Sequence, residues 1–89
     1  MIDGQIDYSL MTDSELVLLI KEGNRGAFTA IYNRYVRLLY TLIMRYVKNH
    51  DDSQDILQFI FEKLWLIRTD LNPSMPIKNF LYAITRNSV

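Results

Sequence analysis

The 89-residue sequence contains no cysteine, a single histidine, two prolines and three glycines. Without cysteine, the chain has neither disulfides nor thiolate ligands for a metal ion. The lone His50 lies in a polar Asn-His-Asp segment, and the sequence has no glycine-rich phosphate loop and no metal-ligand spacing. We therefore expect a protein that is not an enzyme and that has no metal or cofactor.

Long hydrophobic runs are also missing. The longest apolar stretch, Leu16 to Ile20, is far shorter than the roughly 20 residues that cross a bilayer as a helix. The acidic N-terminus lacks the basic start of a secretory signal. The sequence therefore predicts a soluble, cytoplasmic protein without a membrane partner.

The chain also lacks net charge. Ten basic side chains balance ten acidic ones, so the total charge does not indicate nucleic-acid binding. Five of the acids precede residue 25, namely Asp3, Asp7, Asp13, Glu15 and Glu22, which leaves the remainder mildly basic. A basic surface can therefore coexist with an acidic N-terminal helix.

Hydrophobic residues at helical spacing are abundant. About half of the residues are hydrophobic, and the length suits one domain with one core. Residues 1–11 have no helical period and are predicted to form a flexible leader. Helices are predicted near residues 13–22, 25–48, 52–68 and 76–87. Residues 12–89 are thus expected to form an all-α domain, a small four-helix bundle.

Capping signals mark the ends of these helices. Thr12 to Glu15 fits a capping box, in which the two side chains bind each other's backbone amides. Gly23 is expected to end the first helix, because glycine takes the left-handed conformation without steric cost. Asn24 is expected to cap the second helix, and Asp51 or Asp52 the third.

The second helix combines a wide apolar arc with a basic stripe. The arc comprises Phe28, Ile31, Tyr35, Leu38, Leu39, Leu42, Ile43 and Tyr46. Arg34, Arg37, Arg45 and Lys48 fall on the far side, with no acid among them. This stripe is either a solvated face or a contact to backbone phosphates or to a partner.

The third predicted helix has two contrasting sides. Its inner side carries Ile56, Leu57, Ile60, Leu64 and Ile67, with Phe61 at the edge. The opposite side carries Asp55, Gln58 and Glu62, flanked by Phe59, Trp65 and Leu66. Two interpretations remain open: neighbouring helices bury the flanking apolar groups, or the face is a protein interface with aromatic anchors.

The last helix follows a loop with turn residues at Asn72 to Ser74, and Pro76 is expected in its first turn. Its inner side carries Ile77, Phe80, Leu81 and Ile84. Its opposite face carries Lys78, Asn79, Tyr82, Thr85 and Arg86, the composition of a reader of single-stranded nucleic acid. An ordinary polar helix face is the alternative.

Three segments resemble region two of the extracytoplasmic-function sigma factors, which direct bacterial RNA polymerase to promoters. The clearest matches the family at Asp55, Ile56, Gln58, Ile60, Phe61, Leu64 and Trp65, with Phe59 where the family usually has Glu. Phe80 to Asn87 resembles the family's Trp-Leu-Tyr-x-Ile-Ala-Arg-Asn, with Phe80 for Trp and Thr85 for Ala. Gly23 to Tyr35 resembles the family's first two helices.

This resemblance implies partners and site residues. It implies that the third helix docks on the β′ clamp helices of core RNA polymerase through Asp55, Gln58, Phe59, Glu62 and Leu66. It implies that the loop and last helix recognise and melt the minus-ten promoter element. The residues for the unpaired non-template strand are then Asn72, Ser74, Lys78, Asn79, Tyr82 and Arg86. An anti-sigma factor is a further partner expected from the family.

The sequence departs from the family pattern where it ends, at Val89. The family's second domain, which reads the minus-thirty-five element, has no counterpart, and both an excised domain and a natively short protein remain open. The rival hypothesis is a helical adaptor or decoy that binds only protein. It is distinguished by having no salt-dependent affinity for single-stranded DNA.

Overall fold

The computed structural model describes residues 6–89, so the predicted leader over residues 1–5 lies outside the described residues. Four α-helices follow one another: α1 (Asp13–Lys21), α2 (Arg25–Val47), α3 (His50–Leu66) and α4 (Ile77–Ser88). Short 3-10 turns lie at Tyr8–Leu10 and Arg68–Asp70. Residues 6–89 contain no strand, and the predicted all-α, four-helix fold is confirmed.

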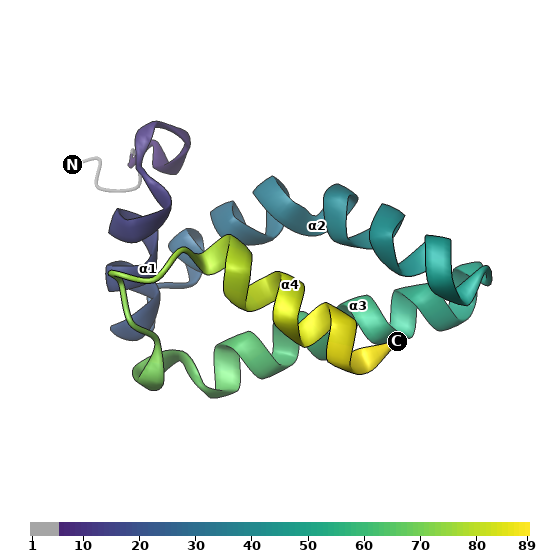
Figure 1. Ribbon diagram of the computed structural model, residues 1–89. Helices are drawn as coiled ribbons and strands as arrows, with labels where there is room; N and C mark the ends of the chain where they lie inside the picture. The colour runs from purple at the N-terminus through teal and green to yellow at the C-terminus, as the bar shows by residue number, and fades with distance from the viewer. Residues whose placement is uncertain (1–5) are drawn as a thin grey trace.

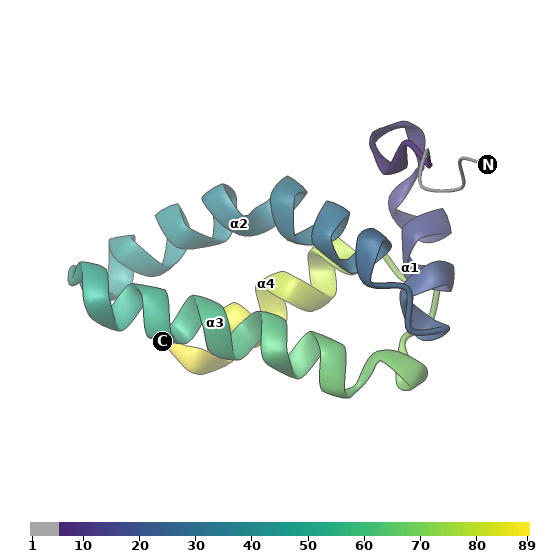
Figure 2. The same ribbon diagram turned by 180° about the vertical axis from the view of Figure 1, so that it is seen from behind.

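The two longest helices form the frame of the domain. α2 and α3 run in opposite directions beside each other, and α4 packs along one side of this pair (Figures 1 and 2). α1 lies at the end where α2 begins (Figure 1). The opposite side of the α2–α3 pair is therefore left open to solvent or to a partner.

One hydrophobic core joins all four helices. Each helix contributes residues from a single stripe, as the sequence periodicity predicts. The largest fully buried members are Leu16, Ile20, Ile31, Leu39, Ile43, Ile60, Leu64 and Leu81. Because these side chains take up the inner stripe of each helix, the outer stripes of α3 and α4 remain available for other roles.

The predicted caps of the first two helices are confirmed. Thr12 Oγ1 accepts from the Glu15 amide at 3.1 Å, and the Glu15 carboxylate accepts from the Thr12 amide at 2.8 Å. Gly23 ends α1 with φ of +89°, and Asn24 accepts from the Ala27 amide at 2.9 Å. These local bonds satisfy amides that have no partner within the helix.

The start of α3 differs from the prediction. Its N-cap is Asn49, whose side chain accepts from the Asp52 amide at 2.9 Å, and neither Asp51 nor Asp52 has this role. Lys48 adopts the left-handed conformation, with φ of 58°, and so reverses the chain within two residues. The helix therefore begins earlier, and both aspartates lie in its first turn, where the helix dipole favours negative charge.

Smaller differences affect the other predicted ends. α3 ends at Leu66, and the next residues tighten into the 3-10 turn at Arg68–Asp70. Pro76 immediately precedes α4 and does not lie within its first turn. The helix then continues to Ser88, one residue beyond the predicted end.

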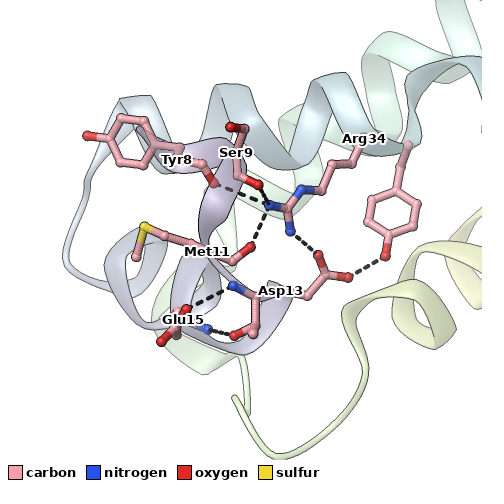
Figure 3. A network of polar contacts seen from close by, with 8 residues as sticks. Tyr8, Ser9, Met11, Asp13, Glu15 and Arg34 are labelled. Atoms are coloured by element: carbon pink, nitrogen blue, oxygen red, sulfur yellow. Dashed lines mark hydrogen bonds and ion pairs between the residues drawn. The ribbon is translucent and has the colours of Figure 1, made fainter. Parts of the chain in front are cut away.

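The described part of the predicted leader contacts α2. Arg34 donates to the carbonyl oxygens of Tyr8 and Met11, at 3.2 and 2.5 Å, and forms an ion pair with Asp13 at 2.7 Å (Figure 3). The Tyr8 ring lies against Gly26, where a β-carbon would come within 2.5 Å of it. Arg34 therefore fastens the N-terminal segment. It does not belong to a free basic stripe with Arg37, Arg45 and Lys48, in which the sequence pattern placed it.

Candidate functional site

The outward stripe of α3 is continuous and exposed. It comprises the five residues predicted to contact a protein, Asp55, Gln58, Phe59, Glu62 and Leu66, and is called here the α3 outer face. Phe59 is 51% exposed and Leu66 is 78% exposed. The Gln58 amide donates to the Glu62 carboxylate at 3.0 Å, which holds the two polar groups together. Exposed apolar groups around a fixed polar pair have the make-up of a protein interface.

Trp65 does not belong to this exposed face, although the sequence pattern placed it there. Its ring packs edge-on against Phe28, with centroids 5.2 Å apart. The guanidinium groups of Arg25 and Arg68 lie 4.8 and 4.3 Å from its ring centroid. Trp65 is thus half-buried between two cations, and its main contacts are with α2 and with the turn after α3.

A groove of about 620 Å³ runs between α2 and α3 beside the outer face. Gln58, Glu62 and Leu66 line it from α3, and Tyr32 lines it from α2. Sequence analysis did not identify Tyr32, because only the packing of the two helices brings it to this groove. Its contact with Phe61, with centroids 4.7 Å apart, joins the two walls.

The loop over residues 71–76, between the two final helical segments, is anchored to α1. Lys21 Nζ donates to the Leu71 carbonyl at 2.5 Å, and Ser14 Oγ donates to the Pro73 carbonyl at 3.0 Å. Within the loop, Asn72 Oδ1 accepts from the Ser74 amide at 2.9 Å. Since two of these bonds come from α1 and one lies within the loop, the loop has a fixed shape beside the start of α4.

The residues predicted to bind DNA fall into two groups. Asn72 and Asn79 line one hollow of about 390 Å³, formed by loop 71–76 and the first half of α4. Tyr82 and Arg86 line a different groove of about 320 Å³, between α4 and α2. Exposed Lys78 approaches the Tyr82 ring to 5.7 Å, while exposed Ser74 lines neither hollow.

Thr85 is fully buried, so its predicted place on the exposed face of α4 is wrong. Its hydroxyl donates to the Leu81 carbonyl at 2.7 Å, which satisfies the hydroxyl without water. On the helical wheel Thr85 lies next to the core stripe, and the packing of α4 against α2 covers it.

Charge separates the two sides of the domain. α2 contains no acidic residue, and none occurs from Leu71 to Val89, so α4 and its loop carry only cations. Asp55 and Glu62 lie on the α3 outer face. The α4 side therefore favours an anionic partner, while the α3 side does not.

Tyr35 links the N-terminal network to α2. Its hydroxyl donates to the Asp13 carboxylate that also pairs with Arg34. Burial, together with this hydrogen bond to a carboxylate, raises the pKa of Tyr35 to about 12. The side chain therefore remains a neutral donor at neutral pH.

Comparison with known proteins identifies the family of this fold. The model of the family Sigma-70 region 2 matches residues 31–89. The chain belongs to this family. Region 2 is a domain of a transcription factor and not of an enzyme, and this domain acts in promoter recognition together with core RNA polymerase. A search of the curated proteins finds no match in sequence.

A solved region 2 has the same fold as this domain. It is described as the NMR structure of the complex formed by an engineered region 2 of sigmaE with GTAAAA. The two chains share 26% sequence identity and a TM-score of 0.80, over 99% of this chain and 85% of the other. The likeness therefore includes α1, which lies outside residues 31–89.

Two further observations concern the described residues. No helix of this region 2 domain is both long and apolar enough to cross a membrane. Over residues 6–89, no three acidic or histidine side chains gather in a way that suits a metal ion.

Proposed function

We propose that this region 2 domain binds the β′ clamp helices of core RNA polymerase through the α3 outer face. In the same proposal, loop 71–76 and α4 recognise the minus-ten element on the non-template strand. The observation that carries the proposal is the match, over 99% of the chain, to a region 2 described in complex with GTAAAA.

The α3 outer face supports the polymerase contact. Phe59 and Leu66 are large apolar groups left in water, and burial of such a side chain contributes about 1.5–3 kcal/mol. The Gln58–Glu62 hydrogen bond fixes polar groups beside them. In this proposal Phe59 and Leu66 are the anchors, and Asp55, Gln58 and Glu62 set the orientation.

The hollow beside loop 71–76 supports recognition of DNA. Asn72 and Asn79 provide amide groups, which can both donate to and accept from base edges. The anchored loop gives these groups a fixed position before DNA binds. Residues 71–89 contain no acid that would repel the phosphates, and Asp70 is the one acidic side chain that lines the hollow.

Melting then follows from binding. A base held in the hollow by hydrogen bonds must first leave the duplex, at a cost of a few kcal/mol. A domain that binds the unpaired strand more tightly than the duplex shifts the equilibrium toward the open form. Core polymerase supplies the remaining contacts in this scheme.

Calorimetric titration with a fragment of the β′ clamp helices tests the polymerase contact. We expect saturable binding by the wild type, and weaker binding by Gln58→Ala and Phe59→Ala. Lys63→Ala is the matched control, because Lys63 is an exposed residue of α3 outside the outer face. Absence of binding by a folded wild-type domain would contradict the proposal.

Fluorescence anisotropy with single-stranded GTAAAA and a randomised hexamer tests the DNA contact. We expect Asn79→Ala to weaken binding, because it removes an amide from the hollow. Asn87→Ala is the matched control, an exposed asparagine on the same helix outside the hollow. If the two variants bind GTAAAA with equal affinity, Asn79 does not contact the DNA.

The same experiments address two further partners. A protein-only adaptor or decoy predicts clamp-fragment or other protein binding without salt-dependent affinity for either hexamer, even when polymerase is present. An anti-sigma factor that covers these faces would compete with the clamp fragment, and calorimetry in the presence of such a protein measures that competition.

A further inference from the structure

The groove between α2 and α4 is a second surface with features of a binding site. α4 runs in roughly the same direction as α2 (Figure 1), and residues from the second halves of the two helices line one groove. Leu38, Arg45 and Tyr46 line the groove from α2, and Tyr82 and Arg86 line it from α4. Its volume is about 320 Å³.

The cations of this groove have no acidic partners. Over residues 6–89, the ion pair of Arg34 with Asp13 is the only one, and neither Arg45 nor Arg86 takes part in it. Both arginines are exposed, and no acidic side chain lines the groove. Two guanidinium groups without an ion-pair partner among residues 6–89, on facing helices, attract an anionic ligand that runs between them.

Aromatic and aliphatic side chains lie between these cations. Tyr46 is 64% exposed and Leu38 is 42% exposed, although the sequence pattern assigned both to the apolar arc of α2. Tyr82 presents a half-buried ring from the opposite wall. Exposed rings beside arginines provide stacking surfaces for bases and charge for phosphates, the combination used by proteins that bind single strands.

The position of the groove connects it with the hollow at loop 71–76. Asn79 lines that hollow and Arg86 lines the groove, on the same helix. Seven residues of α-helix separate them by about 10 Å, which about three nucleotides of a stacked strand span. Tyr82 lies on α4 between Asn79 and Arg86, and the Lys78 ammonium approaches its ring to 5.7 Å.

We propose that the α2–α4 groove binds single-stranded DNA independently of its sequence, as an extension of the site at loop 71–76. Arg45 and Arg86 contact phosphates, and Tyr46 and Tyr82 stack with bases. This inference rests on the proposed function, because both sites take the same strand. An acidic peptide is disfavoured as the occupant, because it gives no reason for two rings to line a groove between arginines.

Nuclear magnetic resonance with the labelled domain and a twelve-nucleotide oligothymidylate tests the location. We expect amide shift changes at Leu38, Arg45 and Tyr46 on α2, together with Tyr82 and Arg86 on α4. Shift changes confined to residues 72–79 would overturn the inference and leave the proposed function intact. Changes produced in the groove by oligoglutamate but not by the oligonucleotide would also overturn it, in favour of an acidic protein partner.

Affinity measurements with matched variants test the contacts. The double variant Arg45→Gln, Tyr46→Ala is expected to weaken oligothymidylate binding about tenfold, which lies within the range for loss of one stacked base. Arg45→Gln alone is expected to reduce the slope of log K against log salt by about 0.7. Arg37→Gln is the control, because Arg37 is an exposed cation of the same helix outside the groove.

The two proposals fail in different ways. If the double variant binds oligothymidylate as tightly as Arg37→Gln does, the groove inference is wrong, while preference for GTAAAA over the randomised hexamer still supports the proposed function. If the wild type binds neither the hexamers nor oligothymidylate, both the DNA part of the proposed function and the groove inference are overturned.

Discussion

The α3 outer face and the α2–α4 groove are both polar surfaces with exposed apolar groups, but their charges differ. The outer face carries Asp55 and Glu62, whereas Arg45 and Arg86 line the groove without an acid. A domain without net charge thus presents one surface suited to a protein and another suited to nucleic acid. Total charge is a poor guide to partners when a fold separates charges of opposite sign onto different faces.

The two surfaces also differ in construction. The outer face comes from one stripe of one helix, so its residues are neighbours in the helical repeat. The groove needs two helices that are far apart in the sequence and packed side by side. The following four predictions test how independent these surfaces are, from the largest expected effect to the smallest.

The largest effect concerns the two sides of α3 itself. Ile60→Ala is expected to destabilise the domain by about 2–5 kcal/mol, because Ile60 is fully buried and its loss leaves a cavity. The adjacent change Phe59→Ala is expected to alter stability by about 0.5 kcal/mol or less, because Phe59 is half exposed. Urea denaturation measures both, and similar losses would show that the outer face is part of the core.

Binding at the two surfaces should depend differently on salt concentration. If the strand makes three phosphate contacts, the slope of log K against log salt is about −2, so a fourfold rise in salt weakens DNA binding about twentyfold. Binding of the clamp fragment should weaken several-fold less, because Phe59 and Leu66 are apolar. Titrations at two salt concentrations measure both, and equal salt dependence would contradict the comparison.

The arginines of α2 should not be equivalent. Arg34→Gln is expected to cost about 1.5 kcal/mol, because it removes charge-assisted bonds to Asp13 and to carbonyl groups of the N-terminal segment. Arg37→Gln, on the exposed side of the same helix, is expected to change stability by about 0.5 kcal/mol or less. Thermal unfolding compares them, and equal stability would show that Arg34 does not fasten the segment.

The smallest effect concerns pH. The pKa of Tyr35 is raised to about 12 from its ordinary value of 10.0, so its contribution to stability is complete below pH 10 and disappears as pH rises through 12. Tyr35→Phe should lose about 0.5–1.5 kcal/mol at neutral pH through the missing hydrogen bond to Asp13. The difference from wild type should shrink between pH 10 and 12, and unfolding at several pH values measures it. If the stability difference between wild type and Tyr35→Phe stays constant over this pH range, ionisation of Tyr35 does not control it.

Much of the fold was predictable from local patterns. The capping box at Thr12 and the cap at Asn24 were predicted correctly, because each involves residues within one helical turn. The cap of α3 was predicted wrongly at Asp51 or Asp52, because the chain turns earlier, at the left-handed residue Lys48, and Asn49 becomes the cap. Lysine gives no signal for that conformation.

The sites were predictable to a lesser degree. The five residues of the α3 outer face are all exposed, as their spacing indicates, while their contact with polymerase remains a prediction. The residues predicted for DNA were treated as one face, but Asn79 and Tyr82 line different hollows. The helical wheel gives directions around one helix and does not include the helix that packs against it.

By itself, the sequence determined the four helices, their ends to within about two residues, the inner stripe of each, and the absence of acids from α2 and from residues 71–89. Only the tertiary structure decided that Arg34 is engaged while Arg45 is free, that Trp65 lies between two cations, and that Thr85 is buried. The physical reason is the distance along the chain over which each kind of interaction acts. Caps and periodicity depend on bonds within about four residues, whereas the partners of a side chain depend on which distant element packs over it.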